Sequence, residues 1–133
     1  MTASSPSFER IDLAPLLAEW QPLLRLADWD IVARYVRHLD RCTVSYDAKY
    51  KHASIALVDP IDWPADATFP YDIEKHLVHE LCHLHLAPLD IANNTPMHLH
   101  EEQAVESLAR AFVALKRRHC PPAPVSPVAT PTP

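Results

Sequence analysis

The apolar residues in the first half of the chain follow two spacings, which predict a helix and then three strands. Over residues 12–26 they recur every three or four positions, as in an amphipathic helix, which Pro22 is expected to kink or split. The following segments are rich in β-branched, aromatic or apolar residues, and short connections favour antiparallel pairing between them. The expected strands cover residues 29–37, 43–50 and 53–58.

The second half of the chain is patterned as two helices. Asp72 is suited to cap the N-terminus of a helix over residues 73–86, which ends before Pro88. A further helix is expected over residues 96–118 or 100–118, with an apolar stripe facing the core. The order of elements predicts an α+β fold. The stripe consists of Val105, Leu108, Ala109, Phe112, Val113 and Leu115.

Length and composition indicate one globular domain. The chain has 133 residues, of which 48% are hydrophobic and 22% charged, values typical of a folded protein with a single core. We expect this domain to cover residues 1–119. Residues 121–133 consist only of Pro, Ala, Val, Ser and Thr, so the segment 120–133 is expected to be a disordered, Pro-rich tail.

Charge and cysteine spacing exclude several classes of protein. The net charge of −5 argues against a nucleic-acid partner, and the basic cluster 116–119 is interpreted as cations at a helix C-terminus. The 3 cysteines are far apart, which indicates neither a disulfide framework nor a zinc ribbon. Neither a secretory signal nor an apolar run of about 20 residues is present. We therefore expect a cytoplasmic protein with no membrane contact.

The residues with the clearest chemical meaning lie in the first of the two C-terminal helices. The motif H-E-x-x-H runs from His79 to His83. Side chains four positions apart share a helix face, so both imidazoles can reach one tetrahedral Zn²⁺ ion. Glu80 falls beside the ion, where its carboxylate can take a proton from an activated water. The motif therefore predicts a zinc site with Glu80 as general base.

A catalytic zinc site usually has a third protein ligand, and the next helix offers candidates. Glu101 and Glu102 border its inward face on opposite sides, so helical phase leaves both open. Glu106 is expected to point further outward. His98 and His100 are alternatives to the glutamates.

The motif H-E-L-C-H, followed by E-x-x-V-x-x-L-A over residues 102–109, resembles small gluzincin-type zincins of phages and mobile elements, including the ImmA/IrrE-like family. In that family the downstream glutamate is the third zinc ligand, which implies this role for Glu102. The implied fold is a minimal zincin core, in which an N-terminal helix and the sheet precede the H-E-x-x-H helix and a ligand-bearing helix. The implied activity is zinc-dependent hydrolysis of peptide bonds in a protein or peptide substrate.

The resemblance also suggests how substrate binds. In such enzymes an edge strand before the metal helix pairs with an extended peptide, which here would be residues 53–58. The alternative is that this segment is a core strand. Tyr46, Tyr50 and Tyr71 are each candidates to stabilise an oxyanion, and His76 is either near the site or a half-exposed helix residue.

Two further functional hypotheses come from other classes of protein. In one, the domain binds zinc without catalysis, as a regulatory or partner-binding module. In the other, the motif is accidental and the Pro-rich tail recruits a partner. Stoichiometric zinc separates the second hypothesis from the others.

Overall fold

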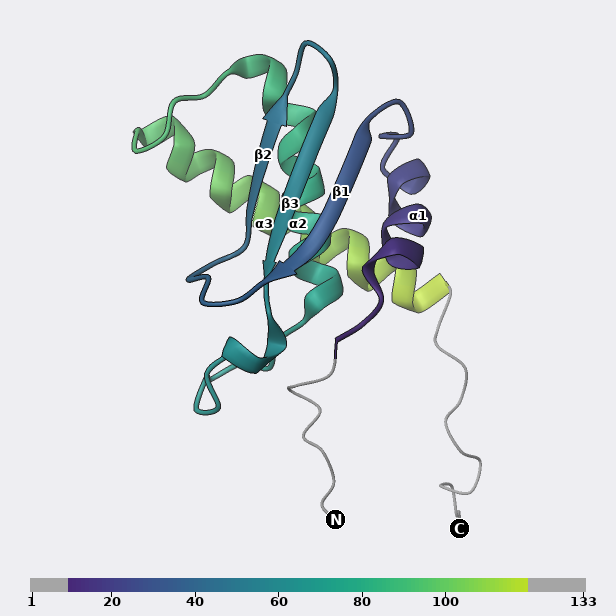
Figure 1. Ribbon diagram of the computed structural model, residues 1–133. Helices are drawn as coiled ribbons and strands as arrows, with labels where there is room; N and C mark the ends of the chain where they lie inside the picture. Colours follow the sequence, from purple (N-terminus) through teal and green to yellow (C-terminus); the bar gives the residue numbers. More distant parts are fainter. Residues whose placement is uncertain (1–9, 120–133) are drawn as a thin grey trace, which may run out of the picture.

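The computed structural model describes residues 10–119, which fold as α+β around one three-stranded sheet (Figure 1). The expected fold class is confirmed at this level. Residues 1–9 and 120–133 lie outside the described part, and with them the start of the expected domain and the expected C-terminal tail. The elements in chain order are α1 (Leu13–Leu23), β1 (Asp30–Val36), β2 (Thr43–Asp47), β3 (His52–Val58), η2 (Pro60–Asp62), α2 (Ile73–Leu86), η3 (Ala87–Leu89) and α3 (Pro96–His119).

The sheet is mixed, with the strand order β1-β3-β2. β1 pairs with β3 in parallel, with Ala33 opposite Ile55, whereas β2 pairs with β3 in antiparallel fashion, with Val44 opposite Ile55. The antiparallel sheet expected from short connections is therefore wrong. β3 is the most apolar strand, and its central position leaves Ile55 and Leu57 with no exposed surface. The two outer strands thus come first in the sequence, and β3 lies between them in the sheet.

The central position of β3 also corrects the expected substrate-binding strand. Residues 53–58 are paired on both sides, so they form the core strand of the second alternative rather than an edge. Within residues 10–119, β2 pairs only with β3 and keeps one edge unpaired. The edge strands that precede α2 are therefore β1 and β2.

One face of the sheet carries the core. Figure 1 shows α2 and α3 behind the sheet, with α1 beside β1. The opposite face is exposed to solvent: Val32 is 58% exposed, and Arg34 donates a hydrogen bond to the Ser54 hydroxyl. This division explains the alternating burial along the strands, because successive side chains point to opposite faces.

α1 begins after Asp12, whose carboxylate caps the first turn, and ends at Leu23. Pro22 lies in the last turn, so it marks the end of the helix and does not split it. The indole N–H of Trp20 donates to Glu74 over 2.7 Å. This hydrogen bond fixes α1 against the start of α2.

α2 covers the residues 73–86 that the sequence predicts. Asp72 caps it, because its carboxylate accepts a hydrogen bond from the backbone N–H of Lys75 over 3.2 Å. Pro88 follows in the short helix η3, after which Asp90 adopts a left-handed conformation with φ of 50°. In a chain with 0 glycines, an aspartate takes this position and turns the chain toward α3.

α3 runs antiparallel to α2. Its C-terminal cations reach the N-terminus of α2, where Lys116 pairs with Glu74 over 2.7 Å and Arg117 pairs with Asp72 over 3.0 Å. The basic cluster therefore joins two helices in addition to its place in the last turn. No helix of residues 10–119 has both the length and the apolar character needed to cross a membrane.

The expected apolar stripe of α3 is only partly buried. Val105, Ala109 and Val113 are buried at a spacing of four residues, while Leu108 and Leu115 are 45% and 48% exposed. Burial of these two leucines in the core is therefore a wrong expectation. The physical reason is that α3 packs on α2 through one narrow ridge of residues four apart.

Candidate metal centre

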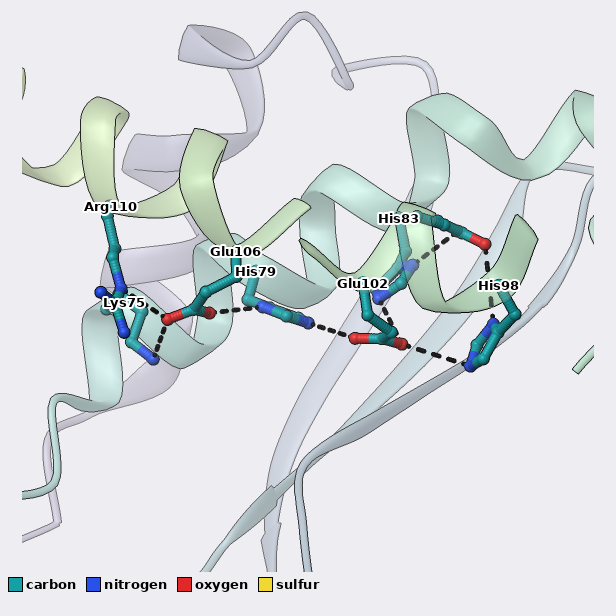
Figure 2. A network of polar contacts seen from close by, with 8 residues as sticks. Lys75, His79, His83, His98, Glu102, Glu106 and Arg110 are labelled. Atoms are coloured by element: carbon teal, nitrogen blue, oxygen red, sulfur yellow. Dashed lines mark hydrogen bonds and ion pairs between the residues drawn. The ribbon is translucent and has the colours of Figure 1, made fainter. Parts of the chain in front are cut away.

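His79 and His83 lie one turn apart on α2, and both side chains face α3. Their ring centroids are 5.1 Å apart. The Glu102 carboxylate lies between them: one oxygen is 3.1 Å from His79 Nε2, and the other is 3.3 Å from His83 Nε2 (Figure 2). One ligand atom from each of the three residues lies within 4.8 Å of the others. The structure thus brings together the three residues predicted as metal ligands.

The donor atoms of these three residues are of the kind that zinc binds. Zinc in proteins binds imidazole nitrogen and carboxylate oxygen at about 2.0–2.2 Å, usually in a tetrahedron. In a tetrahedron of that size, neighbouring ligand atoms are separated by about 3.3 Å. The Glu102 carboxylate comes this close to both imidazoles through different oxygens, at 3.1 Å from His79 Nε2 and 3.3 Å from His83 Nε2. Two histidines and one glutamate also form a donor set used by catalytic zinc sites.

Glu101 contacts the other side of the cluster. One of its carboxylate oxygens lies 2.7 Å from His83 Nδ1, and its side chain is 10% exposed. Helical phase left Glu101 and Glu102 equally open as ligands. The geometry brings Glu102 to the Nε2 atoms of both histidines, whereas Glu101 contacts one histidine through Nδ1.

Glu106 occupies a position that the sequence did not predict. It was expected to point outward, but its side chain is 27% exposed, less than the 40% of Glu102, and it lies 2.8 Å from His79 Nδ1. Lys75 and Arg110 pair with its other oxygen, over 2.9 and 2.8 Å. Burial raises the pKa of Glu106, but hydrogen bonds from Lys75 and His79 outweigh this effect and bring the value to about 2.

The error has a physical reason. The outward expectation came from the apolar stripe of α3 alone, and that stripe contains no information about the charges on α2. The contacts of Lys75 and Arg110 with Glu106 were not predicted either, although the sequence places each residue at a helical spacing from a residue of the site. Lys75 is four residues before His79, and Arg110 is four residues after Glu106, so each shares a helix face with its neighbour.

Glu80 lies beside the two histidines and faces a cleft. The residue is 5% exposed, and it lines a cavity of about 840 Å³ together with the three candidate ligands. Burial raises the pKa of its carboxyl group, and the nearby His79 and His83 act in the opposite direction. A carboxylate in this position can both accept and return a proton.

The cleft extends along β2, one of the two edge strands. Thr43, Val44 and Tyr46 of β2 line one wall, and residues of α2 and of the start of α3 line the other. The candidate metal ligands therefore lie opposite β2. An extended segment bound along this edge would lie in the cavity that Glu80 also lines.

The structure separates the three tyrosines considered as oxyanion donors. Tyr46 lines the cleft, whereas Tyr50 is 62% exposed and is not among the cleft residues. The Tyr71 hydroxyl donates to the carbonyl of Val58 over 2.7 Å and contacts Cys42. Of the three tyrosines, Tyr46 is therefore the one that lines the cleft.

His76 lies at the end of the cleft nearest the start of α2. It packs against the stacked rings of Trp63 and Tyr71, with centroid distances of 5.6 and 5.3 Å. Burial lowers its pKa to about 4. His76 is thus a neutral wall residue near the site, and it is not part of the cluster of candidate ligands.

The remaining candidates have other positions. His98 lies 3.6 Å from a Glu102 oxygen, so it borders the cluster, while His100 is exposed and does not line the cleft. His85 lies 2.6 Å from the carbonyl of Leu24, away from the cluster. Cys82 is 3% exposed and belongs to the core.

Comparison with known proteins adds no family assignment. No family model matches the chain, and searches of curated proteins and of solved structures find no significant match.

Proposed function

We propose that the protein is a small zinc-dependent metallopeptidase of the zincin type. The observation that carries the proposal is the convergence of His79 Nε2, His83 Nε2 and the Glu102 carboxylate, with Glu80 buried beside them in a cleft. A convergence of this kind requires two elements to meet in one register, so it is a stronger indication than the motif alone. The resemblance to ImmA/IrrE-like zincins agrees with this proposal.

His79, His83 and Glu102 hold the ion, and Glu80 moves the proton. Zinc bound there supplies Lewis-acid chemistry, because it lowers the pKa of water to about 7 and polarises a carbonyl group. Glu80 takes a proton from the attacking water and passes it to the amine that leaves. Glu80 suits both steps because its carboxylate lies in the cleft beside the candidate ligands and is 5% exposed, so little bulk water competes for its proton.

The substrate in this proposal is an extended peptide or protein segment. β2 offers an unpaired edge along the cleft, and an edge strand can bind a second chain through backbone hydrogen bonds. Tyr46 extends from the same strand into the cleft. We infer that its phenol donates to the oxygen that becomes negative during attack on the scissile carbonyl.

The proposal is tested by Glu80→Gln in the purified, zinc-loaded protein. The substitution keeps the size of the side chain and removes the base, so the variant should bind zinc as before and lose peptide hydrolysis by about 100-fold or more. Cleavage is measured by mass spectrometry on a library of unstructured peptides. Undiminished cleavage by the variant would contradict the assignment of Glu80.

A zinc-loaded protein that cleaves no peptide in the library would instead support the alternative of a non-catalytic zinc-binding module. The same three ligands serve both functions. The two differ only in whether Glu80 and the cleft act on a substrate.

A further inference from the structure

Both ring nitrogens of each candidate zinc-binding histidine face a carboxylate of α3. Glu106 lies 2.8 Å from His79 Nδ1, and Glu101 lies 2.7 Å from His83 Nδ1. The Nε2 atoms face Glu102 instead, at 3.1 and 3.3 Å (Figure 2). Of these three glutamates on α3, Glu101 and Glu106 therefore contact the Nδ1 atoms, and Glu102 contacts the Nε2 atoms.

This division matters because a neutral imidazole carries its proton on only one nitrogen. If Nδ1–H donates to a carboxylate, the lone pair is fixed on Nε2, which is then free to bind a metal. The carboxylate acceptor also makes the imidazole a better electron donor. The side chains of His79 and His83 are 14% and 9% exposed, so water competes little for the Nδ1 protons.

The two carboxylates differ in their other partners. Glu106 is shared with Lys75 and Arg110, over 2.9 and 2.8 Å, and these cations neutralise much of its charge. Within residues 10–119, Glu101 pairs with no lysine or arginine, and its second oxygen lies 3.8 Å from His98. The negative charge of Glu101 is also the more buried of the two, at 10% exposure against 27%. Glu101 should therefore influence its histidine more strongly.

We propose that Glu101 and Glu106 are positioning residues that hold His83 and His79 with Nε2 toward the zinc, and that Glu101 contributes more to metal affinity. This inference rests on the zinc binding of the proposed function, but it is independent of hydrolysis. In this proposal Glu101 does not bind zinc itself. It holds His83, which does.

The first test is zinc affinity, measured by competition with a chromophoric chelator. Glu101→Gln should lower the affinity by about 10- to 100-fold, Glu101→Ala by at least as much, and Glu106→Gln by less than about 10-fold. The glutamine keeps an acceptor oxygen but removes the charge, whereas alanine removes both. Comparison of the two substitutions at position 101 therefore separates charge from orientation.

The matched control is Glu74→Gln. Glu74 is a glutamate of α2 with a side chain 14% exposed, and it pairs with Lys116 and Arg117 at the far end of the helix pair. Its substitution reports the general effect of neutralising a buried carboxylate, and zinc affinity should stay within about twofold of the unaltered protein. Thermal unfolding of each zinc-free variant identifies any that fails to fold.

The second test is the tautomer of each histidine, read from long-range ¹H–¹⁵N NMR spectra of the zinc-loaded protein. A purely structural role for the two glutamates makes no demand on the tautomer. The proposal expects both rings to carry the proton on Nδ1 and the metal on Nε2. In Glu101→Ala, the Nδ1 proton of His83 should exchange faster with water, while that of His79 stays protected.

Four results would count against the proposal, and a fifth would leave it standing. Unchanged zinc affinity in both Glu101→Gln and Glu106→Gln would overturn it, and so would metal on Nδ1 of either ring. A larger loss in Glu106→Gln would overturn the ranking of the two residues. An unaltered protein that binds zinc but cleaves nothing would contradict only the enzymatic proposal, whereas one that binds no zinc would end both.

Discussion

Lys75 Nζ lies 2.9 Å from a carboxylate oxygen of Glu106, and this contact joins α2 to α3 one helical turn before His79. Both side chains are largely covered, at 18% and 27% exposure. The pair therefore helps to fix the register of the two antiparallel helices. That register is what brings Glu102 opposite the two histidines.

Replacement of Lys75 by methionine should destabilise the zinc-free protein. The substitution keeps most of the side chain's apolar length but leaves the partly buried Glu106 with Arg110 as its remaining cation. We expect the free energy of unfolding to fall by about 1 to 2 kcal/mol, measured by urea denaturation.

Arg110→Met is the matched control for this prediction. Arg110 pairs with the same carboxylate, but its side chain is 73% exposed, so the loss should be less than about 0.5 kcal/mol. If both substitutions destabilised the protein equally, burial of the Lys75 pair could not be what stabilises the register.

Most of the secondary structure could be predicted from the sequence because local signals agree with burial. Asp72 caps α2 at the predicted residue, and α2 ends before Pro88. Both ends of this helix are determined by local residues, a capping side chain at one end and a proline at the other. The order of the strands could not be predicted in the same way. Pairing of β3 between β1 and β2 depends on which strand buries most apolar surface, and connection length does not report this.

The candidate site divides in a similar way. The positions of His79 and His83 follow from helical periodicity, and Glu102 follows from the resemblance of the second motif. The role of Glu106 depends on the register between α2 and α3, which one helix cannot specify. The contact of Glu106 with His79 therefore could not be predicted from the sequence of α3 alone.

Tyr46→Phe should lower kcat for peptide cleavage by about 10-fold or more and leave KM nearly unchanged. The reason is that an oxyanion donor acts in the transition state more than in substrate binding. Tyr50→Phe is the control, because Tyr50 is 62% exposed and lies outside the cleft lining. Equal rates for Tyr46→Phe and the unaltered enzyme would remove Tyr46 from the proposed chemistry.

Peptide binding along β2 predicts a pattern in the substrate backbone. N-methylation removes a backbone N–H, and only every second N–H of a bound strand points toward its neighbour. We expect methylation at alternate positions flanking the scissile bond to weaken cleavage, while the intervening positions tolerate it. KM measured for a series of singly methylated peptides checks this, and a uniform effect at all positions would argue against strand pairing.

The contacts of Glu74 at the start of α2 predict that part of the free energy of unfolding is lost in acid. Burial raises the pKa of Glu74, but hydrogen bonds from Lys116 and Trp20 outweigh it, so the pKa lies below the usual value of 4.5. A lowered pKa in the folded state means that the contribution is present above about pH 4.5 and is lost as the pH falls through the folded value.

Urea denaturation of the zinc-free protein between about pH 6 and pH 3 measures this term. The free energy of unfolding should decrease with acidification less steeply in Glu74→Gln than in the unaltered protein. Identical slopes would show that Glu74 has the same pKa in the folded and unfolded states.

The most direct test of the central claim is the zinc content of the purified protein, measured by elemental analysis beside that of His83→Ala. We expect about one zinc ion per chain in the unaltered protein and a strongly reduced content in the variant, because two ligands hold zinc much more weakly than three. A folded, unaltered protein without zinc after exposure to the metal, or an equal zinc content in His83→Ala, would contradict the account.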